Sequence, residues 1–148
     1  MKKIFLICLT AGITQFANAV PNFWESTSRQ DTQSLSISSD NNSQLTISCH
    51  LNEMSVSGLR KEILVEHNGN FFETSGTKNP LSFLINDTNS FAPQTSNSGA
   101  SKADWNTFLI ALPSAKKIEV YNNNKFLFTL NPRNSNTGLD DLKACLIN

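Results

Sequence analysis

The feature that most constrains this chain is a series of short segments in which apolar and polar residues alternate. Leu35 and Ile37 alternate with serines, and the run 45–49 resumes the alternation after the polar turn 40–43. Successive side chains of a strand point to opposite faces, so each run has one face for a core and one for water. The pattern therefore predicts antiparallel strands, the first two of them joined as a hairpin.

Further runs of the same kind follow along the chain. Asn68-Gly69 separates two of them, and Asn-Gly is a strong hairpin signal because a type I′ turn needs positive φ at both central residues. A second hairpin is predicted around 122–124. The remaining predicted strands lie within 54–58, 59–67, 70–74, 80–86 and the two arms of 118–130.

Two segments carry helical spacing instead. In the first, residues 101–111, Trp105, Phe108 and Leu109 fall on one face, and Pro113 ends the pattern. In the second, Asn136 or Thr137 is the expected N-cap, two aspartates stand in the first turn, and one face is apolar, formed by Leu139, Leu142, Cys145 and Leu146. The predicted fold is mainly β: a small antiparallel β-sandwich or open barrel with two short helices.

The domain limits are expected to leave one irregular segment at the start and another inside. Residues 20–33 are polar and predict a flexible N-terminal arm that either docks through Phe23 and Trp24 or does not, followed by a single β-rich domain over 34–148. Residues 87–101 predict a long exposed loop, and loops of this length are often functional. The candidate binding residues of this region are Asn86, Asp87, Phe91, Thr95, Ser98 and Lys102.

The first 19 residues have the form of a secretory signal peptide. Lys2 and Lys3 precede a mostly apolar stretch, and Ala17-Asn18-Ala19 places small residues where a signal peptidase inspects them. Cleavage is expected after Ala19, and no second apolar stretch long enough to cross a membrane follows. The pattern looks bacterial, which predicts a periplasmic or secreted product without stable membrane insertion.

Cleavage would leave two cysteines, Cys49 and Cys145. In an oxidising compartment an even pair most simply forms a disulfide, and a bridge closing a loop of about 100 residues stabilises a fold by about 4.7 kcal/mol in the chain-entropy model. Two free buried thiols, or a catalytic or metal-binding thiol, are the alternatives. Metal binding has little support because neither a C-x-x-C pair nor a dense His/Cys cluster is present.

Composition and motifs exclude several classes of function. The 148 residues have a formal net charge of zero and only 16% charged residues, so no basic field for nucleic acid exists. The glycines stand singly, which leaves no phosphate-binding loop, and no hydrolase or zinc motif can be found. His50 and Cys49 are strand neighbours that should point to opposite faces, and His67 precedes a turn. No catalytic residue, metal or cofactor is predicted.

From Leu45 onward the chain resembles bacterial periplasmic β-domains of the invasion-associated locus B type and small exported proteins that accompany type VI secretion. The likeness lies in the order of its parts: the strand 45–49, the strand 81–87, the helix beginning Trp105-Asn106-Thr107-Phe108-Leu109, the hairpin 118–130 and the closing stretch 138–145. The long loop at 87–102 and Asn131-Pro132-Arg133 depart from the pattern. The resemblance implies a periplasmic fold with a disulfide and supplies no enzymatic residues.

These observations predict an exported, non-enzymatic protein that acts by binding another protein at the bacterial cell envelope. A sharper form of the hypothesis is an inhibitor or immunity protein that inserts an exposed loop into a cleft. The alternatives are a thiol-dependent redox or hydrolytic enzyme that uses Cys49 and Cys145, and a structural or adhesive subunit.

Overall fold

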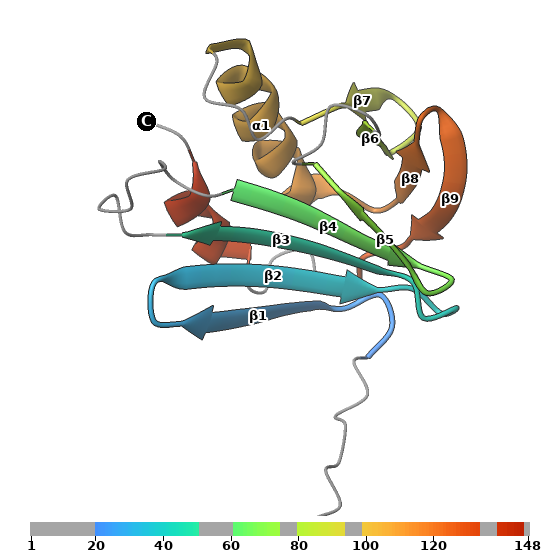
Figure 1. Ribbon diagram of the computed structural model, residues 1–148, viewed down its shortest axis with the longest axis horizontal. Coiled ribbons are helices and arrows are strands. Elements are labelled where there is room, and N and C mark those ends of the chain that lie inside the picture. Colours follow the sequence, from blue (N-terminus) through green and yellow to red (C-terminus); the bar gives the residue numbers. More distant parts are fainter. Residues whose placement is uncertain (1–19, 51–60, 75–79, 94–98, 134–138, 147–148) are drawn as a thin grey trace, which may run out of the picture.

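A computed structural model describes residues 20–50, 61–74, 80–93, 99–133 and 139–146, and this part of the chain is mainly β, as the alternation predicts (Figure 1). The strands and helices are, in chain order, β1 (Trp24–Arg29), β2 (Thr32–Ser38), β3 (Gln44–His50), β4 (Lys61–His67), β5 (Asn70–Glu73), β6 (Leu81–Ile85), β7 (Asn89–Phe91), α1 (Gly99–Ala111), η1 (Leu112–Ser114), β8 (Ile118–Asn122), β9 (Lys125–Leu130) and η2 (Leu139–Cys145).

The strands form two separate antiparallel sheets. One has the order β1-β2-β3-β4-β5 and the other the order β7-β6-β8-β9. Within the described residues each sheet keeps two edge strands, so the fold is a two-sheet arrangement and not a closed barrel. In Figure 1 the helices α1 and η2 and the smaller sheet all lie on the same side of the five-stranded sheet.

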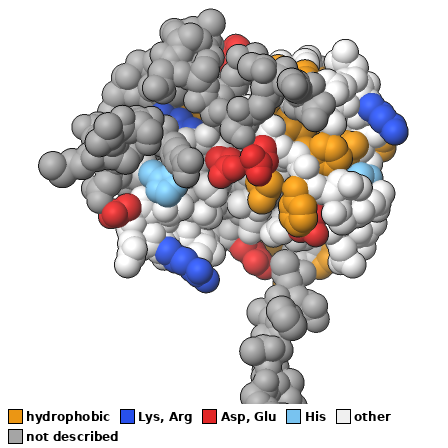
Figure 2. Space-filling model, viewed as in Figure 1, with side chains coloured by type: hydrophobic (Ala, Val, Ile, Leu, Met, Phe, Trp, Pro, Cys, Tyr) orange, Lys and Arg blue, Asp and Glu red, His pale blue; other side chains and the backbone are white. Residues whose placement is uncertain are grey.

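The visible surface carries few charges. Figure 2 shows Lys, Arg, Asp and Glu side chains standing mostly apart on a largely uncharged face, with hydrophobic side chains gathered over β5. On β5 the side chain of Phe71 is 63% exposed. On this face the low charged fraction of the sequence appears as scattered charges among uncharged polar side chains.

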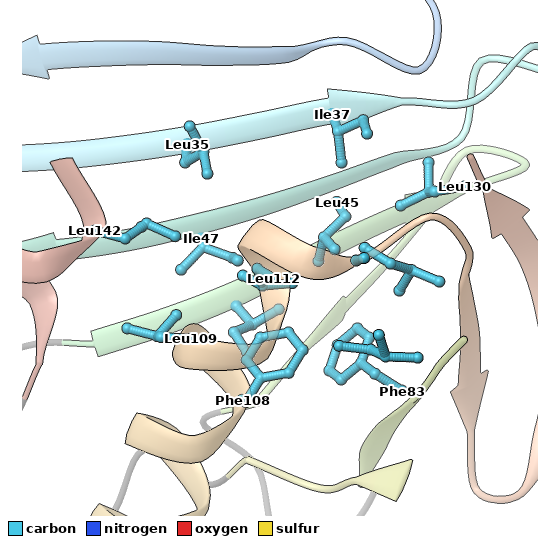
Figure 3. Close-up of a cluster of buried hydrophobic side chains, with 14 of the residues drawn as sticks. Leu35, Ile37, Leu45, Ile47, Phe83, Phe108, Leu109, Leu112, Leu130 and Leu142 are labelled. Carbon is cyan, nitrogen blue, oxygen red and sulfur yellow. The ribbon is translucent and has the colours of Figure 1, made fainter. Parts of the chain in front are cut away.

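The register of the five-stranded sheet explains why its apolar residues alternate. Leu35, Ile47 and Ile63 are cross-strand partners in one row, and Ile37 and Leu45 stand in the next. All five side chains are buried, and the intervening serines and threonines face outward. Figure 3 shows this inner face meeting side chains of α1, η1, β6 and β9, among them Phe83, Phe108, Leu109, Leu112 and Leu130.

The predicted hairpins form through the expected turn chemistry. Asn68 and Gly69 both have positive φ, and so do Asn123 and Asn124 between β8 and β9. These left-handed positions are ones that asparagine and glycine adopt at little cost. The hairpins predicted at these two turns are therefore confirmed.

The expectation that residues 20–33 form an irregular arm is wrong. Residues 24–29 are a strand, β1, which pairs with β2 from Trp24↔Ile37 to Arg29↔Thr32. Alternation could not reveal it because β1 is an edge strand in which only Trp24 is buried. Its order comes from backbone hydrogen bonds to β2, which leave no mark on side-chain hydropathy.

The expected loop at 87–101 is also wrong in part. β7 occupies Asn89–Phe91, and α1 begins at Gly99, two residues before the predicted start. The terminal helix is present as the 3-10 helix η2, with Leu139, Leu142 and Cys145 buried as predicted. The predicted strand at 54–58 and the N-cap at Asn136 or Thr137 lie outside the described residues. No helix in the described part is long and apolar enough to span a membrane.

Candidate functional site

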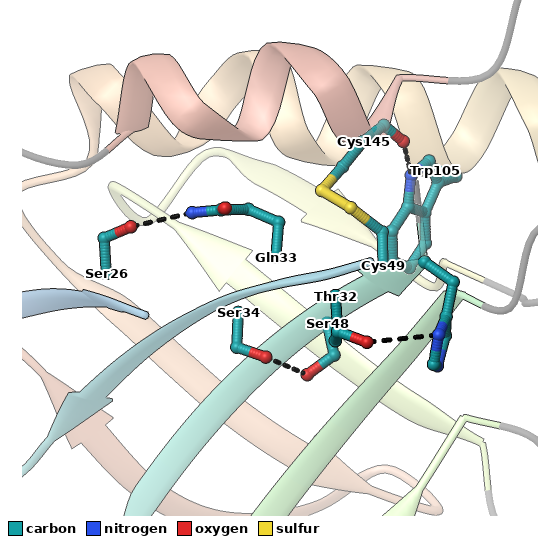
Figure 4. The surroundings of a disulfide bond; sticks show 9 residues. Ser26, Thr32, Gln33, Ser34, Ser48, Cys49, Trp105 and Cys145 are labelled. Atoms are coloured by element: carbon teal, nitrogen blue, oxygen red, sulfur yellow. Dashed lines mark hydrogen bonds between the residues drawn. A yellow bond between two sulfur atoms is a disulfide. The ribbon is translucent and has the colours of Figure 1, made fainter. Parts of the chain in front are cut away.

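Cys49 and Cys145 form the predicted disulfide, which joins β3 to η2. Their Cα atoms are 5.6 Å apart, and each residue is only 1% exposed. Figure 4 shows the bridge next to Trp105, whose indole Nε1–H donates to the backbone carbonyl of Cys145 at 3.0 Å. A covalent bond and a buried hydrogen bond thus hold the end of η2 against the core.

The start of η2 is held by β1. The Ser26 hydroxyl donates to the Asp141 carboxylate at 2.7 Å, and the Gln33 side-chain amide donates to the Ser26 oxygen at 2.8 Å. This small network explains why the structure turns Asp141 toward the sheet. The neighbouring Asp140 instead pairs with Lys143 at 2.8 Å, so the two aspartates diverge, as expected of successive residues at a helix start.

With η2 fixed in this way, a groove of about 540 Å³ lies between it and α1. Its volume falls within the roughly 300 to 1,000 Å³ typical of ligand pockets. The lining is mostly aliphatic: Leu109, Ile110, Pro113, Leu139, Asp140, Leu142, Lys143 and Leu146. Ile110 is 66% exposed, which is unusual for an aliphatic side chain of a helix whose other large apolar residues are buried.

The polar part of the groove is one ion pair. Lys143 lowers the pKa of the Asp140 carboxyl by hydrogen bonding and charge, and Asp140 raises the pKa of Lys143 for the same reasons. Both side chains are largely exposed, so solvent screens the pair and it adds little to stability. The two charges neutralise each other, and the groove therefore offers apolar surface with no net charge at its rim.

The described residues that were predicted to form one binding loop belong to different elements. Asn86 and Asp87 lie in the turn after β6, whereas Phe91 belongs to β7 and packs on Phe108 with ring centroids 5.9 Å apart. Lys102 belongs to α1. Thr95 and Ser98 lie outside the described residues.

The histidines have local partners. His50 Nδ1 is 3.1 Å from the Thr32 hydroxyl, and His67 Nδ1 is 2.7 Å from the Ser43 hydroxyl. The ring of His67 stacks on Phe128 at 5.4 Å. Ser43 is 1% exposed, so this Ser/His contact is closed to a substrate. Within the described ranges no group of three or more His, Cys, Asp or Glu side chains could hold a metal ion.

The groove is not predicted by any motif of the sequence, although Ile110 gives one signal for it. Trp105, Phe108, Leu109 and Leu112 define the buried stripe of the helix, and Ile110 falls outside that stripe. An aliphatic residue off the core face of an amphipathic helix is a candidate contact residue. The second wall could not be foreseen, because η2 reaches α1 only through tertiary packing.

Comparison with known proteins gives one positive result. A family model described as YfjT matches residues 22–139, which is most of the chain and includes both sheets, α1 and the start of η2. No curated protein and no solved structure matches the chain.

Proposed function

Since the chain belongs to the YfjT family, we propose that this family member is an exported domain that binds another protein at the bacterial cell envelope, with the groove between α1 and η2 as its contact surface. The observation that carries the proposal is the buried Cys49–Cys145 bridge, which ties η2, one wall of the groove, to β3. Disulfides persist in oxidising compartments and are rare in reducing ones. A binding surface that depends on such a bond suits a protein that works outside the cytoplasm.

The chemistry of the groove favours a protein segment as its occupant. A small apolar ligand would leave Ile110 partly in water, whereas a segment of a second protein would cover it and the aliphatic floor together. The rim pair of Asp140 and Lys143 is neutral as a unit, so it does not select a charged head group. The expected partner segment presents a row of aliphatic or aromatic side chains flanked by uncharged polar groups.

Two more specific hypotheses about the partner are part of the same proposal. The likeness to exported domains of the invasion-associated locus B and type VI secretion-associated kind, and a role as an inhibitor or immunity protein, both describe a partner of this type. In the inhibitor version the contact surface moves from the predicted loop to the groove, because Phe91 packs against Phe108. The burial of both cysteines supports binding over thiol chemistry, since a working thiol needs access to its substrate.

Export and the bridge are tested together by the intact mass of protein recovered from the periplasm. A mass that starts at Val20 and gains no alkyl groups under non-reducing conditions is expected. Protein that retains Met1, or that is alkylated at Cys49 and Cys145 without reduction, would contradict export with a closed bridge.

The binding surface is tested by site-specific photo-crosslinking in growing cells. A photoreactive residue at position 110 is expected to give one discrete protein adduct, and the same residue at position 71 none. Phe71 is the matched control because it is as exposed as Ile110 but lies on β5. The adduct partner, once purified, should bind the wild-type chain and Phe71→Asp equally, and Ile110→Asp about tenfold or more weakly, as for a central apolar contact. Equal labelling from both positions, no adduct, or no effect of Ile110→Asp would overturn the groove as the contact surface.

A further inference from the structure

A second surface, which shares no residues with the groove, lies on the outer face of the smaller sheet. The side chains of β8 alternate so that Ile118 and Val120 are buried, while Glu119 and Tyr121 face outward. Tyr121 stands between Ser82 of β6 and Phe126 of β9 in the sheet register. The rings of Tyr121 and Phe126 meet edge to face at 5.7 Å, and Phe126 is 51% exposed.

Polar groups on this face form a hydrogen-bonded chain that runs from Asp87 through Lys117 and Glu119 to Tyr121. Lys117 Nζ lies 2.7 Å from an oxygen of Asp87 and 2.7 Å from Oε1 of Glu119. The Tyr121 hydroxyl donates to Oε2 of Glu119 at 2.6 Å. The backbone that carries Lys117 is also held in place, because the Asn86 side-chain oxygen accepts hydrogen bonds from the backbone N–H groups of Lys116 and Lys117 at 2.8 and 3.2 Å.

Lys117 and Glu119 of this hydrogen-bonded chain can form further hydrogen bonds to a ligand. An ammonium group has three donors, of which Lys117 uses two here, and each oxygen of the Glu119 carboxylate can accept more than one bond. Hydrogen bonds from Lys117 and Tyr121 lower the pKa of Glu119, so it stays ionised and accepts strongly. Because its donors already hold it in place, little side-chain entropy would be lost on binding.

Beside this hydrogen-bonded chain is a hollow of about 230 Å³, lined by Ser82, Phe83, Leu84, Ser90, Tyr121 and Asn124. It is smaller than the roughly 300 Å³ at which pockets for drug-sized molecules begin, so it suits one small ring. Two hydroxyls and an amide offer directional polar contacts, and the side chains of Leu84 and Tyr121 offer apolar ones. The lining therefore combines hydroxyl recognition with an apolar contact at one place.

We propose that this face, named here the Tyr121 face (Ser82, Leu84, Ser90, Glu119, Tyr121, Asn124 and Phe126), binds a neutral pyranose ring. A pyranose has an apolar C–H face that packs on aromatic rings and an equatorial belt of hydroxyls that both donate and accept. Asp87 and Glu119 outnumber Lys117, so an anionic ligand is disfavoured. The inference rests on residues that the groove does not use and stands independently of the proposed protein partner.

The test is binding of defined sugars to the folded chain, observed by saturation-transfer NMR and isothermal titration. The probes are the methyl glycosides of glucose, galactose and N-acetylglucosamine, a linear trisaccharide of N-acetylglucosamine, and glucuronate. At least one neutral sugar should bind in the millimolar range and glucuronate more weakly. A trisaccharide that binds tighter than its monomer indicates a glycan strand as the ligand, and equal affinities indicate a free sugar.

Matched variants assign the binding to the Tyr121 face. Glu119→Gln keeps the shape and removes the charge, and should weaken binding about tenfold or more, as expected for a lost charged acceptor. Tyr121→Leu removes the aromatic ring on which the sugar would pack and should also weaken sugar binding. Glu62→Gln and Phe71→Leu make the same changes on the five-stranded sheet and should leave binding unchanged. If no neutral sugar binds, or if Glu119→Gln binds as the wild type does, the inference is wrong, and that result leaves the groove proposal intact.

Discussion

The groove and the Tyr121 face differ in how the chain builds them. The groove joins residues from α1 and from η2, and η2 is held in place by a bridge to β3 and by contacts with β1 and α1. The Tyr121 face comes from neighbouring strands of one sheet, β6, β7, β8 and β9. The groove therefore depends on a few long-range links, whereas the Tyr121 face depends on the many backbone hydrogen bonds of paired strands.

The largest test of this difference is removal of the bridge. The double variant Cys49→Ala, Cys145→Ala should lose about 2 to 5 kcal/mol of unfolding free energy, because the unfolded chain is no longer constrained by the cross-link. Chemical denaturation measures the loss. In the fraction that remains folded, hydrogen exchange should rise in η2 much more than in β8. Equal rises in both elements would show that the two surfaces depend on the bridge alike.

A smaller effect is expected from the hydrogen bond beside the bridge. Trp105→Phe leaves the buried carbonyl of Cys145 without its indole donor and removes part of a fully buried ring. The cost should be about 2 to 3 kcal/mol, combining an unsatisfied acceptor with a small cavity. Thermal unfolding under non-reducing conditions measures it. Trp24→Phe, at the other buried tryptophan, compares the two sites; a larger loss there would contradict a special role for Trp105.

The turn that supports the Tyr121 face gives the third test. Asn86 has φ of 51° and hydrogen bonds the backbone at Ser114, Lys116 and Lys117. Asn86→Ala should cost about 1 to 2 kcal/mol, since alanine tolerates a left-handed conformation poorly and makes none of these bonds. Asn86→Gly relieves the backbone alone and should recover part of the loss. Hydrogen exchange should change around β8 and leave η2 as it was.

The smallest expected effect is electrostatic and concerns Tyr121, the single tyrosine of the chain. Hydrogen bonding to Glu119 raises the Tyr121 pKa, so the neutral phenol favours folding below its ordinary pKa, and this contribution is lost as pH rises through the raised value. Glu119→Gln should bring the Tyr121 pKa back toward its ordinary value with little change in stability. Tyrosinate absorbance during an alkaline titration measures the pKa. An unchanged pKa would show that the contact does not persist in solution.

Much of the fold could be predicted because its strands obey a local rule. Leu35, Ile37, Leu45 and Ile47 alternate with polar residues because each strand has one buried face, and Asn68-Gly69 meets the steric demand of a tight turn. β1 escaped prediction since its order comes from backbone pairing at a sheet edge. The binding surfaces escaped because each joins residues whose side chains have an ordinary local explanation.

Asn22 shows the same limit at a single residue. It is 2% exposed, its amide donates to Asp40 at 3.1 Å, and its side-chain oxygen accepts the Asn131 backbone N–H at 2.9 Å. In the sequence it is one asparagine among many in a polar stretch. Only the folded chain gives it the task of tying the start of the domain to the end of β9.

The sequence by itself determined the secondary structure of most strands and the turns at Asn68-Gly69 and Asn123-Asn124, because hydropathy periods and φ preferences act over a few neighbouring residues. Tertiary structure decided which outward side chains meet. Ile110 lines a groove only because the bridge to β3 and the Trp105 hydrogen bond hold η2 beside α1. Lys117 meets Asp87 only because β8 pairs with β6. Contacts between residues distant in the chain depend on the closure of the whole fold, which no local pattern specifies.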